Sequence, residues 1–597
     1  MLIASLLLAA SAAIPFRGVV EGYYGRPWGT EGRISLMKFM GERDLNTFVY
    51  GPKDDPYHHA KWREPYPPKE AADFKKLLAV AKANKINFYW AVHLGNFNGE
   101  YDAVFKKFDA MYQLGVRAFA IFFDDFGSAN ATLHAEIGNR VIKEFLEKKA
   151  DCAPLLICPN VYWGGGHPYQ RELGEKLDQR AMIMWTGASI CSDIRSGAVE
   201  RITEAFKRPP FIWWNWPVND YCRKSLLLGR TYGVDNCRYS GFVLNPMENC
   251  EANKIAIHGF SEWCKDPDNF DSVKSWEEGF AKIYKDPEVA KAMKVFATHN
   301  SDQGPNAHGY RREESVGYEN ITDPKEMDKL FKEVGKATAI LKDKLPKAEP
   351  QLFWEIEGWL DNERYLMQEG ILALKLKAAK STKDRATLIT KLKKVRKDSA
   401  KAIEKHQEKF RAATFQGDRG WINPPLASRK VLRPLIENML TATLKDLYQE
   451  KTGKSFDASQ GFTAFSTVKS MPKLAVSRDG KYANIERVLE MKSIAPGESF
   501  GISVPPSWQT DYFHAKLDNP EAVRVGVIEV SKDGTNWVKL ETKNDGEQMH
   551  TNLKPKDGWK HARYVNKGNK AVNFKINQFK FDVQGEASPI DQLLEEL

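Results

Sequence analysis

Eight short apolar runs, rich in β-branched and aromatic residues, alternate with amphipathic stretches over the first 270 residues. The runs cover residues 18–24, 47–52, 87–93, 118–125, 154–160, 181–187, 211–216 and 241–246, and stretches between them such as 70–84 and 101–114 have a helical pattern. Strands that alternate with helices form parallel sheets. Eight such repeats in about 250 residues predict an α/β fold, a (β/α)8 TIM barrel. A doubly wound open sheet fits less well, because it has a glycine-rich first turn and six strands.

The chain has 597 residues, too many for one hydrophobic core, which stops growing at about 250 to 300 residues. We expect the barrel over residues 16–290, a helical domain over 291–455 and a β-sandwich over 460–585. Helical patterns such as 325–344 and 351–380 dominate the middle of the chain. Short alternating strands, such as 523–531 and 572–581, dominate its end.

The N-terminus resembles a secretory signal. Residues 2–8 are apolar, and Ala9-Ala-Ser-Ala-Ala13 has the small residues of a cleavage site. The usual basic residues before the apolar run are missing, which a trimmed start or a buried N-terminal strand would explain. We expect residues 1–13 to be a signal peptide and the protein to be secreted or periplasmic in a bacterium. No other segment has the roughly 20 apolar residues that a membrane span needs.

The charge distribution and the cysteines indicate which ligands are not expected for this chain. The formal net charge is +10, and much of the excess lies between Lys375 and Arg411 in helical sequence. A solvated helix face explains this excess better than attraction to acidic glycans or nucleic acid, and no nucleic-acid motif is present. The seven cysteines form no CxxC pair and no Cys/His cluster, so we expect no metal and no cofactor. Export would permit disulfides among them.

The most informative segment is a buried strand that ends in two adjacent acids. Five apolar residues, 119–123, precede Asp124 and Asp125. Like charges this close raise at least one pKa, which would leave one acid protonated and one ionised near neutral pH. Glycosidic cleavage needs this division of roles. Taken alone, the pair is equally well explained as a helix N-cap in the loop after the strand.

Six segments together resemble glycoside hydrolase family 84, the O-GlcNAcase and hyaluronidase-like enzymes. They are, in chain order, Gly18-Val-Val-Glu-Gly-Tyr-Tyr-Gly-Arg-Pro-Trp28, Tyr50-Gly-Pro-Lys-Asp-Asp55, Phe122-Phe-Asp-Asp125, Cys158-Pro-Asn-Val-Tyr162, Trp213-Trp-Asn-Trp-Pro-Val-Asn-Asp220 and Leu244-Asn-Pro-Met247. They look like the family's first, second, catalytic, fifth, seventh and eighth barrel strands. The resemblance covers residues 16 to 265 and predicts a retaining exo-β-N-acetylglucosaminidase.

The resemblance implies substrate-assisted catalysis, in which the substrate's 2-acetamido oxygen is the nucleophile and an oxazoline is the intermediate. Asp124 would stay anionic, orient the acetamide N–H and stabilise the developing positive charge. Asp125 would protonate the leaving oxygen and then deprotonate the attacking water. The substrate would be a glycan or glycoprotein with terminal β-GlcNAc.

The resemblance also assigns the sugar pocket. Sugar hydroxyls are expected to contact the Gly22 carbonyl, Lys53, Asp220 and Asn245, while Asn215 is expected to hold Asp124 in position. Four residues are expected to line the acetamide pocket: Cys158, Tyr162, Thr186 and Trp213. Each also has a structural interpretation when taken singly, such as a bulge, a turn, a surface charge or core packing.

Some positions depart from the family pattern. Ala91-Val-His-Leu-Gly95 replaces a Ser-Pro-Gly type of turn, so His93 is interpreted as a structural histidine. Asn160-Val161 replaces a Thr-Glu or Thr-Asp pair, and the loop Gly164-Gly-Gly-His167 is unusual. These changes leave the predicted chemistry intact, but they bear on what binds beyond the GlcNAc.

Other hypotheses stay open at this point. The barrel could be a related hexosaminidase for GalNAc or hyaluronan, or a glycan-binding barrel without activity. The C-terminal sandwich resembles discoidin-type carbohydrate-binding modules. Trp508, Tyr512 and Trp537 are its candidates for stacking on sugars, and core packing explains them equally well.

Overall fold

A computed structural model describes residues 14–125, 127–301, 304–305, 311–312, 321–413, 424–430, 432–456, 463–468, 475–479, 482–486, 488–504, 509–554, 557–584 and 589–597. The expected signal peptide, residues 1–13, and Trp508 lie outside these residues. The chain divides into two compact units. One unit runs to Leu374 and includes Lys394–Ile436, and the other comprises Lys375–Lys393 and Glu437–Leu597. The domain boundaries expected from the sequence stay predictions.

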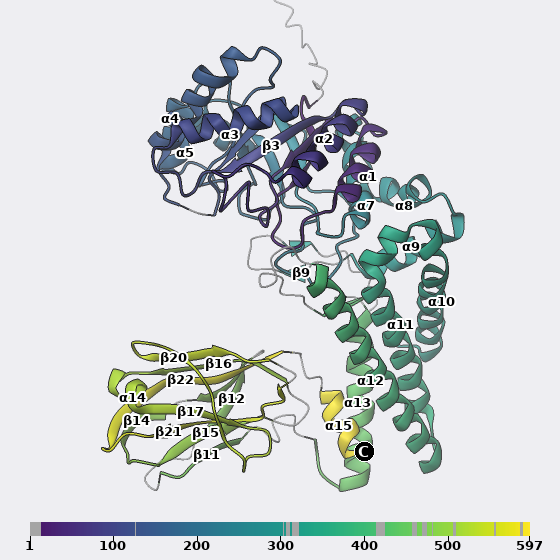
Figure 1. Cartoon of the computed structure of the whole chain (residues 1–597). Coiled ribbons are helices and arrows are strands. Elements are labelled where there is room, and N and C mark those ends of the chain that lie inside the picture. Colours follow the sequence, from purple (N-terminus) through teal and green to yellow (C-terminus); the bar gives the residue numbers. More distant parts are fainter. Residues whose placement is uncertain are drawn as a thin grey trace, which may run out of the picture. The chain divides into compact units, whose positions relative to one another are not determined.

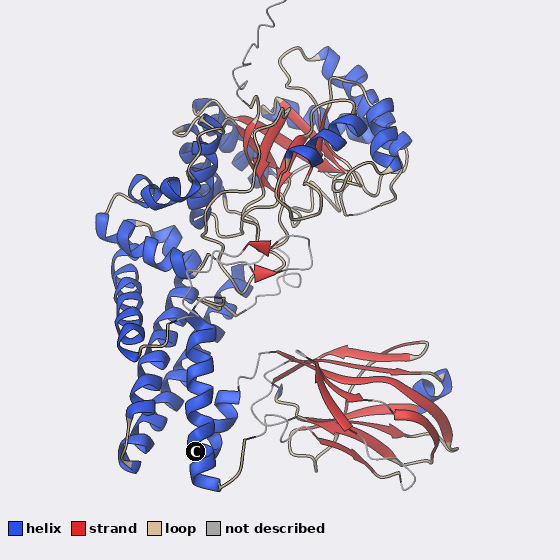
Figure 2. Ribbon diagram, turned by 180° about the vertical axis from the view of Figure 1, so that it is seen from behind, coloured by secondary structure: helices blue, strands red, loops and turns tan. Residues whose placement is uncertain are grey.

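The first unit contains the predicted barrel, and all eight apolar runs contribute one strand each (Figures 1 and 2). The strands are β1 (Arg17–Glu21), β2 (Thr47–Tyr50), β3 (Asn87–His93), β4 (Ala118–Phe122), β5 (Leu156–Cys158), β6 (Met182–Trp185), β7 (Phe211–Trp214) and β8 (Gly241–Leu244). Each strand pairs in parallel with the next, and β1 pairs with β8 to close the barrel. The predicted TIM barrel is confirmed, although most strands end before the polar residues of their runs.

The barrel strands read as continuous apolar runs because both of their faces are buried. Successive side chains along a strand point to opposite faces. Val20 and Val49 accordingly belong to the cluster inside the barrel, while Val19 and Phe48 belong to the cluster between the strands and the helices. A parallel sheet covered on both faces needs apolar residues on each face.

Seven helices follow the barrel strands: α1 (Thr30–Gly41), α2 (Pro68–Ala83), α3 (Tyr101–Leu114), α4 (Ala131–Arg140), α5 (Pro168–Lys176), α6 (Ser196–Phe206) and α7 (Lys254–Lys265). The expected helices over 70–84 and 101–114 are therefore present. Short connections from strand to helix, such as 94–100, collect at the carboxyl ends of the strands. This is the end at which TIM barrels place their active sites.

The expected helical region follows the barrel: α8 (Ser272–Ile283), α9 (Pro287–His299) and four longer helices, α10 (Pro324–Ala348), α11 (Pro350–Ala378), α12 (Thr382–Ala413) and α13 (Leu432–Thr452). Two short strands, β9 (Gly304–Pro305) and β10 (Arg311–Arg312), pair between α9 and α10. The side chain of Asp323 accepts a hydrogen bond from the Lys325 amide and caps α10, and Pro324 is its first residue. None of the helices in the described part of the chain is both long and apolar enough to cross a membrane.

A buried carboxyl group joins α11 to the segment after β8 within the first unit. Glu355 is fully buried, and its Oε2 accepts hydrogen bonds from the amides of Glu251, at 2.8 Å, and Ala252, at 3.4 Å. Gln351 donates to its other oxygen. Burial, followed by the charge of Glu251, raises the pKa of Glu355 to about 8.

The second unit contains the β-rich end of the chain. One sheet has the order β11 (Thr463–Ser466), β15 (Ser499–Ser503), β21 (His561–Asn566), β17 (Gly526–Ser531) and β18 (Val538–Lys539). The other contains β12 (Ala475–Asp479), β13 (Tyr482–Glu486), β22 (Val572–Gln584), β16 (Gln509–Leu517), β20 (Gln548–Asn552), β19 (Lys543–Asp545) and, beside β22, β14 (Val488–Ile494). The helix α15 (Pro589–Glu596) ends the chain. All strands pair antiparallel, and side chains such as Phe500 and Phe579 of the two sheets share one core.

One expected strand of the second unit is only partly present. Residues 523–531 were predicted as a strand, but α14 (Pro520–Val525) precedes β17. The side chain of Asn519 accepts a hydrogen bond from the Glu521 amide, and Pro520 is the first residue of the helix. The cap and the proline favour the start of a helix at this point, although the β-branched residues that follow would favour a strand. Trp537 contacts Arg563, whose guanidinium lies 4.0 Å from the ring centroid. Sugar binding by Tyr512 and Trp537 stays a prediction.

We predict that Glu355→Gln stabilises the protein above about pH 8 and has little effect near pH 5. The pKa of Glu355 is raised in the folded state. Its contribution to the free energy of unfolding is therefore complete below its ordinary pKa and is lost as the pH rises to about 8. The neutral amide of the glutamine does not ionise and so avoids this loss, which is about 1.4 kcal/mol for each unit by which the pKa is raised. Thermal unfolding of the wild type and the variant from pH 5 to 9 measures the effect.

The matched control is Glu333→Gln, which removes an exposed acid from α10. Its effect on the melting temperature should vary little over the same pH range. An effect of Glu355→Gln that does not grow with pH would contradict the assignment of a neutral, buried carboxylic acid.

Candidate active site

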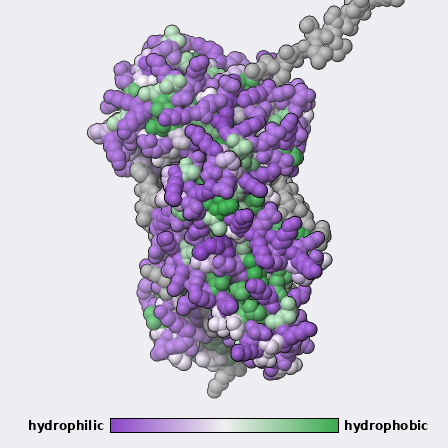
Figure 3. All heavy atoms as spheres, turned by 90° about the vertical axis from the view of Figure 1, so that its right-hand side faces the viewer, coloured by the Kyte–Doolittle hydropathy of each residue, from purple (hydrophilic) through white to green (hydrophobic). Residues whose placement is uncertain are grey.

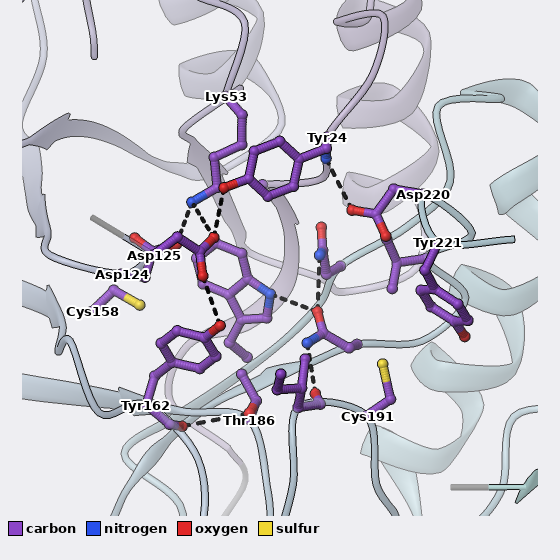
Figure 4. Close-up of a pocket in the computed structure, with 16 residues that line it drawn as sticks. Tyr24, Lys53, Asp124, Asp125, Cys158, Tyr162, Thr186, Cys191, Asp220 and Tyr221 are labelled. Atoms are coloured by element: carbon purple, nitrogen blue, oxygen red, sulfur yellow. Dashed lines mark hydrogen bonds and ion pairs between the residues drawn. The ribbon is translucent and has the colours of Figure 1, made fainter. Parts of the chain in front are cut away.

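A pocket of about 510 Å³ opens at the carboxyl ends of the barrel strands. All eleven residues predicted for the site line it: Gly22, Lys53, Asp124, Asp125, Cys158, Tyr162, Thr186, Trp213, Asn215, Asp220 and Asn245. The lining also includes five residues that the sequence did not single out: Tyr24, Ile190, Cys191, Val218 and Tyr221 (Figure 4). The structure thus brings together the predicted set, while the role of each residue stays a prediction.

Asp124 and Asp125 both face this pocket because the chain leaves the strand direction between them. Neighbouring residues of a strand would point to opposite faces. The strand β4 ends at Phe122, and Asp125 has a φ of 62°, in the left-handed region that non-glycine residues rarely adopt. This turn costs conformational energy, as backbone strain at functional sites often does. It allows two consecutive carboxylates to serve one pocket.

His93 holds the peptide group of this turn. Its Nε2 lies 2.6 Å from the carbonyl oxygen of Asp124, and the Gly95 amide donates to its Nδ1 at 3.2 Å. Because Nδ1 accepts, Nε2 carries the hydrogen and donates to the carbonyl. Burial lowers the pKa of His93, which favours this neutral form. His93, which replaces the turn usual in the family, is therefore a hydrogen-bonded structural histidine directly beneath the acid pair.

The ammonium group of Lys53 lies between the two carboxylates. It hydrogen-bonds to Oδ2 of Asp124 and lies 3.6 Å from Oδ2 of Asp125. Although burial alone would lower it, the charges of Asp124 and then Asp125 raise the pKa of Lys53, so the lysine stays protonated. The ammonium group thus offsets part of the cost of placing two carboxyl groups side by side in a buried pocket.

The two acids have different surroundings. The side chain of Asp124 is 6% exposed and that of Asp125 is 28% exposed. The hydroxyl groups of Tyr162 and Tyr24 donate to Asp125, at 2.7 and 2.8 Å. Burial alone would raise the pKa of Asp125. The charge of Lys53 and the hydrogen bonds from the two tyrosines have a larger effect in the opposite direction, so the pKa is lowered. The sequence-based expectation of a raised pKa is thus not met for Asp125 in the pocket without substrate, because Lys53 and the hydroxyl groups outweigh burial.

Two buried acceptors in the pocket have no hydrogen-bond partner within the described part of the chain. They are Oδ1 of Asp124 and Oδ1 of Asn245. A buried acceptor without a partner costs about 1 to 3 kcal/mol. A ligand that donates hydrogen bonds to both atoms would recover this cost, so the pocket favours a ligand with two hydrogen-bond donors.

Asn215 organises the opposite wall. Its Oδ1 accepts from the indole of Trp213 at 3.0 Å and from the amide of Asn245 at 2.9 Å, and its own amide donates to the Ile190 carbonyl at 2.7 Å. These bonds orient Asn245 so that its oxygen is left for a ligand. The role expected from the sequence, holding Asp124 in position, stays a prediction.

The remaining predicted residues complete the wall. Asp220 accepts from the Tyr24 amide at 3.0 Å and so ties the loop after β1 to the loop after β7. Cys158 is buried, and burial raises the pKa of its thiol, so it forms a small neutral surface. All seven cysteines are free. A Cβ atom at Gly22 would lie 2.2 Å from the Trp213 ring, so only glycine fits there.

The pocket residues that the sequence analysis missed lie in loops. Tyr24 belongs to the first apolar run, and its hydroxyl group could have been recognised as a partner for an acid. Ile190, Cys191 and Tyr221 come from connections after β6 and β7, which have no periodic pattern. Their placement depends on the loop path, which the local sequence does not predict.

Comparison with known proteins supports the resemblance of this barrel. Residues 17–298, a little under half of the chain, match the family model of beta-N-acetylglucosaminidase. The O-GlcNAcase-like resemblance expected from the sequence is thereby confirmed.

Individual members of the β-N-acetylglucosaminidase family are similar to this chain. The protein O-GlcNAcase of Mus musculus is 34% identical over 288 residues, which are 44% of this chain and 31% of the mouse protein. The solved structure of CpGH84D is 29% identical, with a TM-score of 0.59 over 72% of this chain and 75% of its own. A mutant O-GlcNAc hydrolase of Thermobaculum terrenum, 24% identical, has the same fold, with a TM-score of 0.60 over 74% of this chain and 97% of its own.

We predict that His93→Phe destabilises the protein by about 1 to 3 kcal/mol, because the buried carbonyl oxygen of Asp124 loses its donor. His93→Gln keeps an amide donor at similar reach and should cost clearly less. Urea unfolding of the three proteins measures the difference. Equal losses for both variants would show that ring packing, and not the hydrogen bond, is what the turn requires.

Proposed function

We propose that the protein is a retaining exo-β-N-acetylglucosaminidase that releases terminal β-GlcNAc from glycans or glycoproteins with the substrate's acetamide as nucleophile. The observation that carries this proposal is Oδ1 of Asp124, which accepts no hydrogen bond from the described residues and is buried in the pocket beside a second carboxylate. The family match supports the activity. The whole mouse relative is much longer than the matched region, so the substrates of this chain are proposed from its own pocket.

The placement of the two acids supports substrate assistance. A retaining enzyme with a protein nucleophile holds its two carboxyl groups on opposite sides of the scissile bond. Asp124 and Asp125 are consecutive and contact the same ammonium group of Lys53, so they reach the sugar from one side. A nucleophile on the other side would then come from water or from the substrate, and retention of configuration requires the substrate's 2-acetamido group, which is adjacent to the anomeric carbon.

Asp124 is the acid that orients the acetamide. Its Oδ2 is held by Lys53, while its Oδ1 is left to accept a hydrogen bond from the acetamide N–H. Such a bond directs the acetamide oxygen towards the anomeric carbon. The negative charge of Asp124 then stabilises the positive charge that develops on the sugar and the acetamide.

Asp125 is the acid and base. Its greater exposure and its contacts with Tyr24 and Tyr162 place it nearer the pocket mouth, where a leaving group would depart. An incoming glycosidic oxygen displaces water and competes for these contacts, which raises the pKa of Asp125 towards the protonated form that donates to the leaving group. The resulting carboxylate accepts the proton of the water that opens the oxazoline.

The remaining pocket residues bind the sugar. Asn245 offers its free oxygen to a hydroxyl group, and Lys53, Asp220 and the Gly22 carbonyl border the same space. Tyr162, Thr186, Trp213 and Cys158 form a surface of mixed polarity that suits the acetamide and its methyl group.

We predict that the wild type hydrolyses an aryl β-GlcNAc glycoside faster than the β-GalNAc analogue. Asp124→Asn should lower kcat by about 10²- to 10³-fold, because the carboxylate that stabilises the transition state is lost. Asp125→Asn should lose about 10²- to 10⁴-fold with a poor leaving group and much less with an activated aryl group, which needs no proton. Initial rates with both leaving groups measure the two effects.

The variant Asp109→Asn, an exposed carboxylate on α3, is the control for a surface change of the same kind. It should resemble the wild type. Absence of hydrolysis by the wild type, or equal losses for Asp125→Asn with both leaving groups, would contradict the assignment of roles.

A further inference from the structure

Trp163 stands out because its side chain is exposed. It is 46% exposed, and only two other large hydrophobic residues of the described chain, Val273 and Val538, are similarly exposed. Hydrophilic side chains cover most of the face of the molecule drawn in Figure 3. Because Trp163 follows Tyr162, which lines the pocket, its exposed ring is a candidate contact for a ligand that extends beyond the pocket.

The backbone around Trp163 is fixed to the rim of the pocket. Before it, the Tyr162 carbonyl accepts from the amide of Thr186 at 2.8 Å. After it, the Gly164 amide donates to the Gly187 carbonyl at 2.9 Å, and the indole of Trp185 donates to the Gly164 carbonyl at 2.7 Å. Residues on both sides of Trp163 are thus tied to the segment that carries Thr186.

The carbonyl group of Trp163 is held as well. The side-chain amide of Gln170, which is fully buried at the start of α5, donates to it at 3.0 Å. The same amide donates to the Val161 carbonyl at 3.2 Å. A loop whose successive peptide groups are hydrogen-bonded loses little further backbone entropy when a ligand binds. The exposure of the ring is therefore a property of an ordered loop.

The position of Trp163 relative to Asp125 indicates which side of the scissile bond it serves. Tyr162, the preceding residue, donates to Oδ1 of Asp125 at 2.7 Å. Asp125 is the proposed acid, so it faces the leaving group. Trp163 itself is not part of the pocket lining. Its ring is thus outside the lining of the space for the GlcNAc, and the residue before it contacts the acid that faces the leaving group.

The glycines that follow leave room for a rigid ring. Gly164 has a φ of 77°, and a Cβ atom there would meet nothing within 4 Å. At Gly165 and Gly166 a Cβ atom would instead meet Arg201, at 3.7 Å, and a guanidinium nitrogen of Arg171, at 3.0 Å, so the open space lies at Gly164. A flat aromatic surface with open space beside it suits the apolar C–H face of a pyranose.

From these contacts we infer that Trp163 forms a leaving-group subsite that stacks on the sugar ring to which the terminal β-GlcNAc is attached. The inference rests on the proposed function and specifies its substrate class as an oligosaccharide with a second pyranose. Neither the pocket residues nor the family match assigns a role to this residue.

The test compares kcat/KM for the disaccharide GlcNAc-β-1,4-GlcNAc with that for the trifluoroethyl β-GlcNAc glycoside, which has the same sugar but no ring in the leaving group. Trp163→Ala should lower the ratio of the two values about tenfold, which corresponds to about 1.4 kcal/mol. Trp163→Tyr, which keeps an aromatic face, should keep most of the ratio. The matched control is Val273→Ala, which truncates an exposed apolar residue on α8 and should leave the ratio as in the wild type.

Three results would overturn the inference, and they are distinguishable. An unchanged ratio in Trp163→Ala, with an active wild type, would remove the subsite and leave the proposed function intact. If Trp163→Ala lowers kcat/KM only for a peptide whose serine carries GlcNAc, the ring binds polypeptide and not a second sugar. A wild type that cleaves neither the disaccharide nor the trifluoroethyl glycoside would refute the proposed function, and the subsite with it.

Discussion

The active site depends on one interaction, the contact of the Lys53 ammonium group with the carboxylates of Asp124 and Asp125. Two adjacent buried carboxylates repel each other and lose their hydration, and without a cation one of them would take up a proton. The Lys53 ammonium group offsets part of this cost, and its own protonation is favoured by the same two carboxyl groups. The carboxylate of Asp124, held by Lys53, then lies beside the space in which the proposed transition state develops positive charge.

The barrel makes this contact possible by ending two strands at the same level. Lys53 follows β2 and the acids follow β4, and both strands point in the same direction in a closed parallel sheet. The left-handed conformation of Asp125 and the hydrogen bond from His93 then turn the second carboxylate into the pocket. The barrel thus places the three charged residues at one end of the strands, and the left-handed turn at Asp125 directs the second carboxyl group into the pocket.

The sequence predicted the barrel well, because strands buried on both faces are unbroken apolar runs whatever their neighbours are. Site residues such as Lys53 and Asn245 could be found because they follow those runs directly. The left-handed turn at Asp125 could not be predicted, since neither glycine nor asparagine marks it. The pKa of Asp125 depends on Tyr24 and Tyr162, which are far apart in the sequence, and on Lys53, so its downward shift could not be predicted from the adjacent acids alone.

The central claim is that the acetamide of the substrate is the nucleophile. The most direct measurement is kcat/KM for aryl β-glycosides whose 2-acetamido group carries zero, one, two or three fluorine atoms, since each fluorine withdraws electrons from the carbonyl oxygen that attacks. The account predicts a steep, continuous fall of kcat/KM along this series. Values that stay nearly constant, with the aryl leaving group still released, would contradict it and would require a nucleophile from the protein or from water.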